Sequence, residues 1–168
     1  MAKDYKRQID LKLKEFFKRT KINNYDLEVG MAVGLFVDPL FYKIEHGDYL
    51  NAFFSTITYH LEHNMRGSVY PYVKKFYDGV IDFKDIDKLS EELIEIKEKL
   101  KFFEPDKIMW DNENLSLTPP WGNNNAKRIT NLSNYFYTSN GGKDLFEIFF
   151  KAFESAKEIE ENIIIQSI

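Results

Sequence analysis

The chain has 168 residues, contains no cysteine and carries a net charge of −4 at pH 7, with a pI near 5.5. This length suits one domain with its own core, and the lack of cysteine excludes disulfides, thiol nucleophiles and cysteine-based metal sites. The acidic balance argues against nucleic-acid binding, which normally requires a basic excess. Phe, Tyr and Trp make up 16% of the residues, enough either to fill a core or to form a recognition surface.

The first 30 residues differ in charge from the rest. Residues 1–30 hold eight Lys/Arg and five Asp/Glu, a balance of +3, and the remaining 15 basic and 22 acidic residues give 31–168 a balance of −7. Apolar residues recur with helical spacing over about 4–20, and basic residues populate the other faces, which predicts a basic amphipathic helix. Its apolar stripe consists of Ile9, Leu13, Phe16 and Phe17. Such a helix either docks its stripe on the rest of the domain or binds an anionic membrane or nucleic acid.

The charged start of the chain and its apolar runs also bear on location. Charges run from Lys3 to Glu15, and no stretch approaches 18 consecutive apolar residues. We therefore expect neither a secretory signal peptide nor a membrane-spanning helix, and we expect the protein in the cytoplasm. We divide the chain into a basic N-terminal helix and linker, residues 1–30, and a single domain, residues 31–168.

Apolar runs bounded by turn residues predict extended segments in the domain. They cover 31–37, 41–44, 107–111, 134–138 and 163–165. Asp38-Pro39 separates the first two runs, so they form either a hairpin or one bent strand. The unbroken run of three isoleucines near the C-terminus predicts a strand in a covered position of the sheet. Residues 112–125, rich in Asn, Pro and Gly, are expected to form a long loop.

Helical apolar spacing occurs in four further segments. These are 48–64, 70–77, 84–103 and 143–159. Asp48 is the expected N-cap of the first helix, and Pro71 suits the first turn of the second. Strands at the start, middle and end, separated by these helices, predict an α+β domain with a small β-sheet and amphipathic helices packed on it. Most Phe residues lie on the helical stripes, so the aromatic excess is expected mainly to fill the core.

The search for catalytic motifs finds no complete set. His60 and His63 stand at i, i+3, whereas a zincin helix needs i, i+4 with a third ligand elsewhere. The Gly141–Lys143 segment lacks the spacing of a phosphate-binding loop. Asp111 and Glu113 could be read as paired carboxylates for acid–base catalysis. Because they lie at the edge of a predicted loop, we interpret them as part of an acidic surface instead. We therefore predict no catalytic residues, no metal and no cofactor, and a protein that is not an enzyme.

Several sequence blocks, taken in order, resemble a known family. The blocks are residues 31–38, 53–57, 107–111, 117–123 and 130–146. The Pro-Pro-Trp-Gly-Asn loop at 119–123 and the Thr-x-Leu-x-x-Tyr-Phe-x-Thr segment at 130–138 are the most specific. Over about 31–165 the chain thus resembles immunity protein 70, a family of bacterial polymorphic-toxin immunity proteins. It departs from that pattern at Asn140-Gly141-Gly142, where one Gly is expected, and adds residues 1–30.

The resemblance implies a non-catalytic immunity protein that binds and neutralises a cognate toxin domain in the producing cell. An acidic body would steer rapid association with a basic toxin, and interface anchors are often aromatic. The predicted partner-binding residues are Trp110, Asp111, Glu113 and Trp121. Trp121 alternatively folds back to fill the core. Two other functions stay open: an adaptor that uses the basic N-terminal helix on nucleic acid or a membrane surface, and a small enzyme with an unrecognised site.

Overall fold

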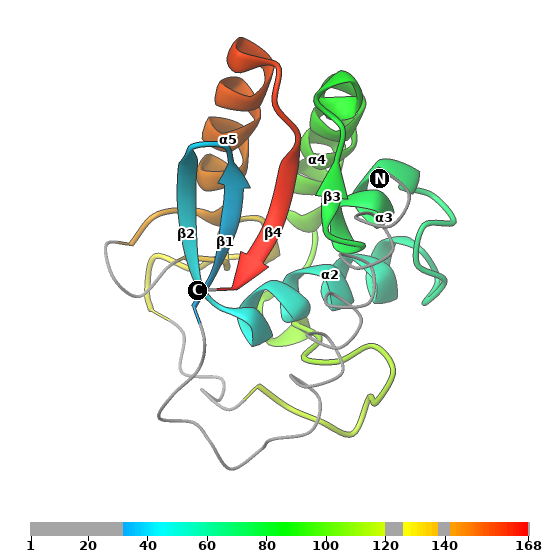
Figure 1. Ribbon diagram of the computed structural model, residues 1–168. Helices are drawn as coiled ribbons and strands as arrows, with labels where there is room; N and C mark the ends of the chain where they lie inside the picture. Colours follow the sequence, from blue (N-terminus) through cyan, green and yellow to red (C-terminus); the bar gives the residue numbers. More distant parts are fainter. Residues whose placement is uncertain (1–31, 120–125, 138–141, 168) are drawn as a thin grey trace.

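The computed structural model describes residues 32–119, 126–137 and 142–167 of the chain. The predicted N-terminal helix over 4–20 and the side chain of Trp121 lie outside these residues. Within the described part, no helix combines the length and apolar character needed to cross a membrane. The elements form an antiparallel sheet with helices packed against it, which confirms the predicted α+β class (Figure 1).

The sheet has four strands in the order β2-β1-β4-β3. Their bounds are Ala32–Val37 for β1, Leu40–His46 for β2, Val80–Ile81 for β3 and Ile163–Ser167 for β4. β1 and β2 form a hairpin around the Asp38–Pro39 turn, with Phe36 opposite Phe41, so of the two expected arrangements the hairpin is the one observed. β4 pairs with β1 on one side and β3 on the other, so the isoleucine run lies in the interior of the sheet, as predicted.

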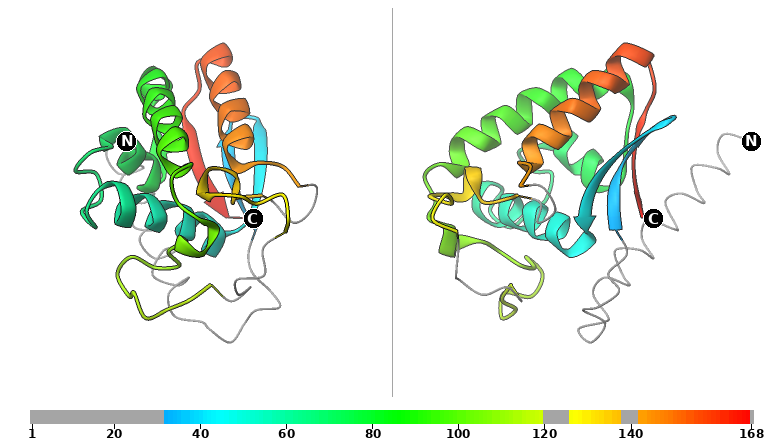
Figure 2. Two further views of the ribbon diagram at one scale, coloured as in Figure 1. Left: turned by 180° about the vertical axis from the view of Figure 1, so that it is seen from behind. Right: turned by 90° about the vertical axis from the view of Figure 1, so that its left-hand side faces the viewer.

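Four α-helices lie in the described part of the chain, and the side view shows three of them on a single side of the sheet (Figure 2). Their bounds are Gly47–Leu61 for α2, Pro71–Tyr77 for α3, Ile86–Leu100 for α4 and Leu145–Ile159 for α5. α5 contacts β1, β2 and β4, while α2 contacts β2 and α3 borders β3. Asp144 caps α5 by accepting a hydrogen bond from the Phe146 N–H at 2.8 Å.

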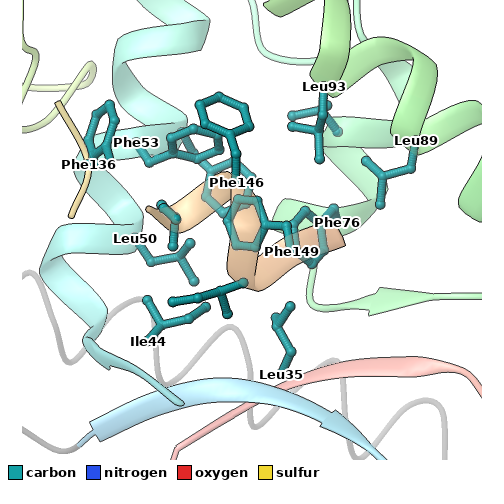
Figure 3. Close-up of a cluster of buried hydrophobic side chains, with 14 of the residues drawn as sticks. Leu35, Ile44, Leu50, Phe53, Phe76, Leu89, Leu93, Phe136, Phe146 and Phe149 are labelled. Carbon is teal, nitrogen blue, oxygen red and sulfur yellow. The ribbon is translucent and has the colours of Figure 1, made fainter. Parts of the chain in front are cut away.

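The core lies between the sheet and the helices and is rich in phenylalanine (Figure 3). Phe53 of α2 occupies its centre and packs edge-to-face on the rings of Phe136, Phe146 and Phe149, with centroids 5.2–5.4 Å apart. Leu35 contributes to the same core from the sheet and is fully buried. The aromatic excess therefore does mainly fill the core, because edge-to-face packing lets rings fill the interior at favourable geometry.

Several local predictions were wrong. The predicted strand over 107–111 is instead a 3-10 turn at Pro105–Lys107 followed by irregular chain. For 134–138 we expected a strand or a short extended piece; over the described residues 134–137 no strand forms, since a 3-10 turn spans Leu132–Asn134 and Tyr137 makes an isolated bridge to Asp144. These segments obtain their backbone partners from side chains and turns, not from a strand ladder. The structure adds a strand that was not predicted, β3, which is only two residues long.

The start of α2 also differs from its prediction. His46, not Asp48, is the N-cap residue, and it makes no side-chain capping hydrogen bond. Asp48 lies within the first turn, where a carboxylate favours the positive end of the helix dipole. Burial raises the pKa of the Asp48 carboxyl, and His46 nearby opposes that rise.

Candidate functional site

α2 holds the irregular segment 107–112 by a row of polar side chains. Asn51, Ser55, Thr56 and His60 spread over the half of the helix that faces away from its apolar stripe of Leu50, Phe53 and Ile57. The Asn51 amide donates to the Trp110 carbonyl at 3.3 Å, and the His60 Nε2 lies 2.6 Å from the Lys107 carbonyl. The Thr56 hydroxyl accepts from the Met109 N–H at 3.1 Å. These contacts satisfy the backbone groups that a strand would otherwise pair.

Asn112 joins this segment to two other parts of the chain. Its side chain is almost completely buried, and its Oδ1 accepts from the Ser55 hydroxyl at 3.1 Å and from the Arg66 guanidinium at 2.7 Å. Its Nδ2 donates to the Asn64 side chain at 3.1 Å. Because a buried amide with all these bonds has one favourable orientation, Asn112 fixes the segment relative to α2 and the loop that follows it.

Arg66 lies beside this amide and stacks its guanidinium on the Tyr77 ring, 3.6 Å from the centroid. Burial lowers the pKa of Arg66, while Tyr77, Glu62, Glu113 and Asp78 oppose the shift. The group stays charged at neutral pH because an arginine guanidinium does not lose its proton in proteins. Arg66 thus places a positive charge within the influence of the Glu113 carboxylate.

A buried carboxylate orders the loop that carries Arg66. Glu62 is only 1% exposed, and its Oε1 accepts from the backbone N–H groups of Gly67, Val69 and Tyr70 at 2.9, 3.2 and 3.0 Å. Gly67 has a φ of +82°, and a Cβ there would come within 2.9 Å of the Lys74 side chain. The turn therefore requires glycine at this position. The Glu62 carboxylate serves as the acceptor for the three loop N–H groups, which have no backbone carbonyl as partner in these bonds.

The structure places three of the four predicted partner-binding residues on this fixed segment. Trp110 is half-buried against the core, and Asp111 is also half-buried, while Glu113 is exposed. The Asp111 Oδ1 accepts from the Glu113 N–H at 2.9 Å, which closes a tight turn. Trp121 lies outside the described residues. The sequence therefore located part of a surface, but it missed the residues that position it, Asn112 and Arg66.

The exposed side of this segment is acidic and has apolar neighbours. Between residues 104 and 113 the chain carries four acidic side chains and one lysine, and all but Asp111 are exposed. Apolar side chains with exposed fractions of 62%, 54% and 37% lie on the connected loops at Met65, Leu115 and Leu117. We call residues 104–117 together with 64–66 the acidic platform.

The chemistry of the acidic platform suits recognition. The Asp111 and Glu113 carboxyl groups lie on a turn next to Asn112, which α2 holds. The buried polar side chains of the platform bond to the protein's own side chains. Within the described ranges no three His, Cys, Asp or Glu side chains gather to hold a metal ion. The platform thus offers fixed charge beside apolar area, a combination found in protein–protein interfaces.

The comparisons with known proteins give one family. A family model described as immunity protein 70 matches residues 35–165, which is most of the chain. No curated protein matches, and no solved structure matches. The matched region contains the whole acidic platform and every described helix.

Proposed function

Because the chain belongs to the immunity protein 70 family, we propose that it is a non-catalytic immunity protein that binds a cognate toxin domain and neutralises it in the cytoplasm of the producing bacterium. The family match over residues 35–165 is the observation that carries this proposal. The family implies a toxin as partner. We infer that inhibition occurs by binding, since the platform presents recognition groups fixed by α2.

We propose the acidic platform as the surface that binds the toxin. Asp111 and Glu113 would attract a basic toxin domain, and the −7 balance of residues 31–168 would steer its approach. Trp110 and Trp121 are the proposed aromatic anchors. The hydrogen bonds from α2 support this choice because a surface fixed before binding loses little conformational entropy when the partner arrives.

The test is growth rescue of a bacterium that expresses the toxin encoded beside this gene. The full chain should restore growth, and the variant Asp111→Asn/Glu113→Gln should restore it poorly. These substitutions remove both charges, while the asparagine introduced at position 111 can still accept the turn hydrogen bond from the N–H of residue 113. The matched control is Glu154→Gln/Glu158→Gln on the exposed side of α5, which removes the same charge far along the fold.

The growth-rescue results test two claims separately: that the acidic platform binds the toxin, and that the chain is an immunity protein. Loss of rescue by the platform variant with full rescue by the α5 control supports both. Equal rescue by the two variants would overturn the platform as the binding surface. Failure of the unaltered chain to protect against the toxin, at confirmed expression of both proteins, would overturn the immunity function itself.

Trp121→Ala tests the second aromatic anchor separately. As an anchor, Trp121 should contribute to toxin affinity without contributing to the thermal stability of the free protein, so the variant should bind weakly and melt normally. A lower melting temperature with unchanged toxin affinity would assign Trp121 to the core instead.

A further inference from the structure

The outer face of the sheet carries a row of apolar side chains. Strand alternation directs Val33, Leu35 and Val37 into the core, so Phe36 lies on the opposite face of β1. Phe36 pairs with Phe41 of β2 and with Ile164 of β4, and Ile164 pairs with Val80 of β3. We call these four residues the outer row: Phe41, Phe36, Ile164 and Val80. It crosses the whole sheet, and each member is half-buried.

The next row along the sheet is polar, so the apolar area has a defined limit. Gly34 pairs with Lys43 on one side and with Gln166 on the other, and both of these side chains are exposed. A Cβ at Gly34 would meet the Phe41 ring at 2.5 Å, so the Phe41 ring lies over the glycine and lengthens the apolar area toward the polar row. Alanine at Gly34 would displace this ring.

The described helices leave this face uncovered. α2, α4 and α5 all lie on the core side of the sheet, and the side view shows no described element on the other side (Figure 2). A row of four apolar residues across a sheet normally packs against another layer, because burial of its apolar surface stabilises the fold.

The preceding part of the same chain has the matching pattern. The apolar stripe from Ile9 to Phe17 spans about 12 Å along a helix at 1.5 Å per residue. The outer row spans about 14 Å, since it crosses three strand spacings of about 4.8 Å. The two apolar surfaces therefore agree in length. The +3 balance of residues 1–30 also complements the −7 balance of residues 31–168.

The segment between the predicted helix over 4–20 and β1 is long enough for that helix to reach the outer row, and it joins the sheet at the strand that carries Phe36. The described chain begins at Ala32 in β1, the strand that carries Phe36. Phe36 lies about 13 Å along this strand from Ala32, while the eleven residues 21–31 reach up to about 36 Å when extended. A segment tethered in this way experiences an effective concentration on the order of millimolar, which favours it over a separate partner.

We propose that residues 4–20 form a helix that packs its apolar stripe on the outer row and so completes a third layer of the domain. The occupant is this segment of the same chain, not a membrane, a nucleic acid or a second copy. This assignment makes the basic residues of the segment its solvent-facing side. It is independent of toxin binding, which we place at the acidic platform.

The lack of cysteine allows a direct test in the full-length chain. Ile164→Cys introduces a single thiol in the outer row, whose reaction rate with an aromatic disulfide reagent measures its exposure. Adding Leu13→Asp/Phe16→Asp should raise this rate by about tenfold or more, since the charged stripe no longer packs on the sheet. The matched control Gln8→Asp/Leu11→Asp adds the same charge to the opposite helical face and should leave the rate unchanged.

A second thiol position shows whether the rate change is specific to the Ile164→Cys substitution. Val80→Cys lies in the same row on β3 and should respond in the same way, whereas Gln166→Cys in the polar row should react fast in every background. Equal rates with and without the stripe substitutions, at both thiols introduced in the outer row, would overturn the proposal. Rates that fall with rising protein concentration, together with a dimer in sedimentation, would overturn it in favour of a second copy.

Discussion

The two faces of α2 hold the molecule together by different means. On one face Leu50, Phe53 and Ile57 are at most 1% exposed and pack in the apolar core. On the other, Asn51 and Ser55 hold the 107–112 segment through single hydrogen bonds. Apolar packing spreads its stabilisation over many atoms, whereas each hydrogen bond contributes only about 1 kcal/mol net. Damage to the first face should therefore unfold the domain, and damage to the second should displace the platform from a folded domain.

The largest effect is expected at the apolar face. Phe53→Ala removes a ring that packs edge-to-face on four other aromatic rings at 5.2–5.4 Å, so it should lower the free energy of unfolding by about 3–5 kcal/mol. Denaturant unfolding followed by circular dichroism measures this loss. Ile94→Ala, at a position 56% exposed on α4, is the control and should change stability by less than about 0.5 kcal/mol. Similar losses for the two variants would contradict the central place of Phe53.

The Glu62 carboxylate should have the next largest effect. Glu62→Ala leaves three loop N–H groups without their acceptor, and we expect a loss of about 2–3 kcal/mol because these donors lie beside a buried side chain. Glu62→Gln keeps an acceptor oxygen and should lose less than half of that. Should the two variants unfold at the same denaturant concentration, the three hydrogen bonds are not what orders this loop.

Ser55→Ala tests the polar face of α2 more finely. It removes one hydrogen bond to Asn112 and should cost about 1 kcal/mol of stability, yet it should weaken toxin binding because the platform is no longer fixed. Ser155→Ala on α5 is the matched control, since it removes one serine hydrogen bond, to Tyr42, on the other side of the fold. Calorimetric titration with the toxin should show an affinity loss for Ser55→Ala alone. An equal affinity loss for both would point to general destabilisation.

The smallest effect concerns pH. Burial raises the pKa of the Asp144 carboxyl above its ordinary 3.8, while the Phe146 N–H and Lys97 oppose the rise. The folded state thus keeps this proton to a higher pH than the unfolded chain, so the contribution of Asp144 to stability falls as the pH rises through its raised pKa.

The variant Asp144→Asn shows this dependence directly. Asparagine keeps the helix cap but has no proton to lose, so its stability relative to the unaltered chain should improve as the pH rises from about 4 to about 7. Urea midpoints at both pH values measure the change. A relative stability that falls with rising pH would mean that the Lys97 ammonium, not burial, dominates at this carboxyl.

The fold was largely predictable because its main elements have local patterns. The stripes of α4 and α5 and the alternation in β1 follow from residues within each segment. β3 was missed because two residues give no period. The prediction of a strand over 107–111 was wrong because the partners of that backbone are side chains of α2, 59 and 53 residues earlier in the chain. Such long-range partners leave no periodic signal in the segment itself.

The candidate site was predictable only in part, for the same reason. Asp111 and Glu113 stand out locally as carboxylates on either side of an asparagine. Arg66 and Asn112 carry no motif, and only folding brings them within 2.7 Å. A usable signal did exist: Asn51 and Ser55 are polar residues at i, i+4 beside the apolar stripe of α2, which indicates a second contact face.

Titration of toxin activity with the purified full-length chain tests most directly the claim that inhibition occurs by binding at the platform. The unaltered chain should abolish activity at a stoichiometric ratio to the toxin, with recovery of both proteins intact, and Asp111→Asn/Glu113→Gln should shift the midpoint to higher concentration. Complete inhibition at far below one chain per toxin, or cleavage or modification of the toxin, would contradict the claim and indicate catalysis.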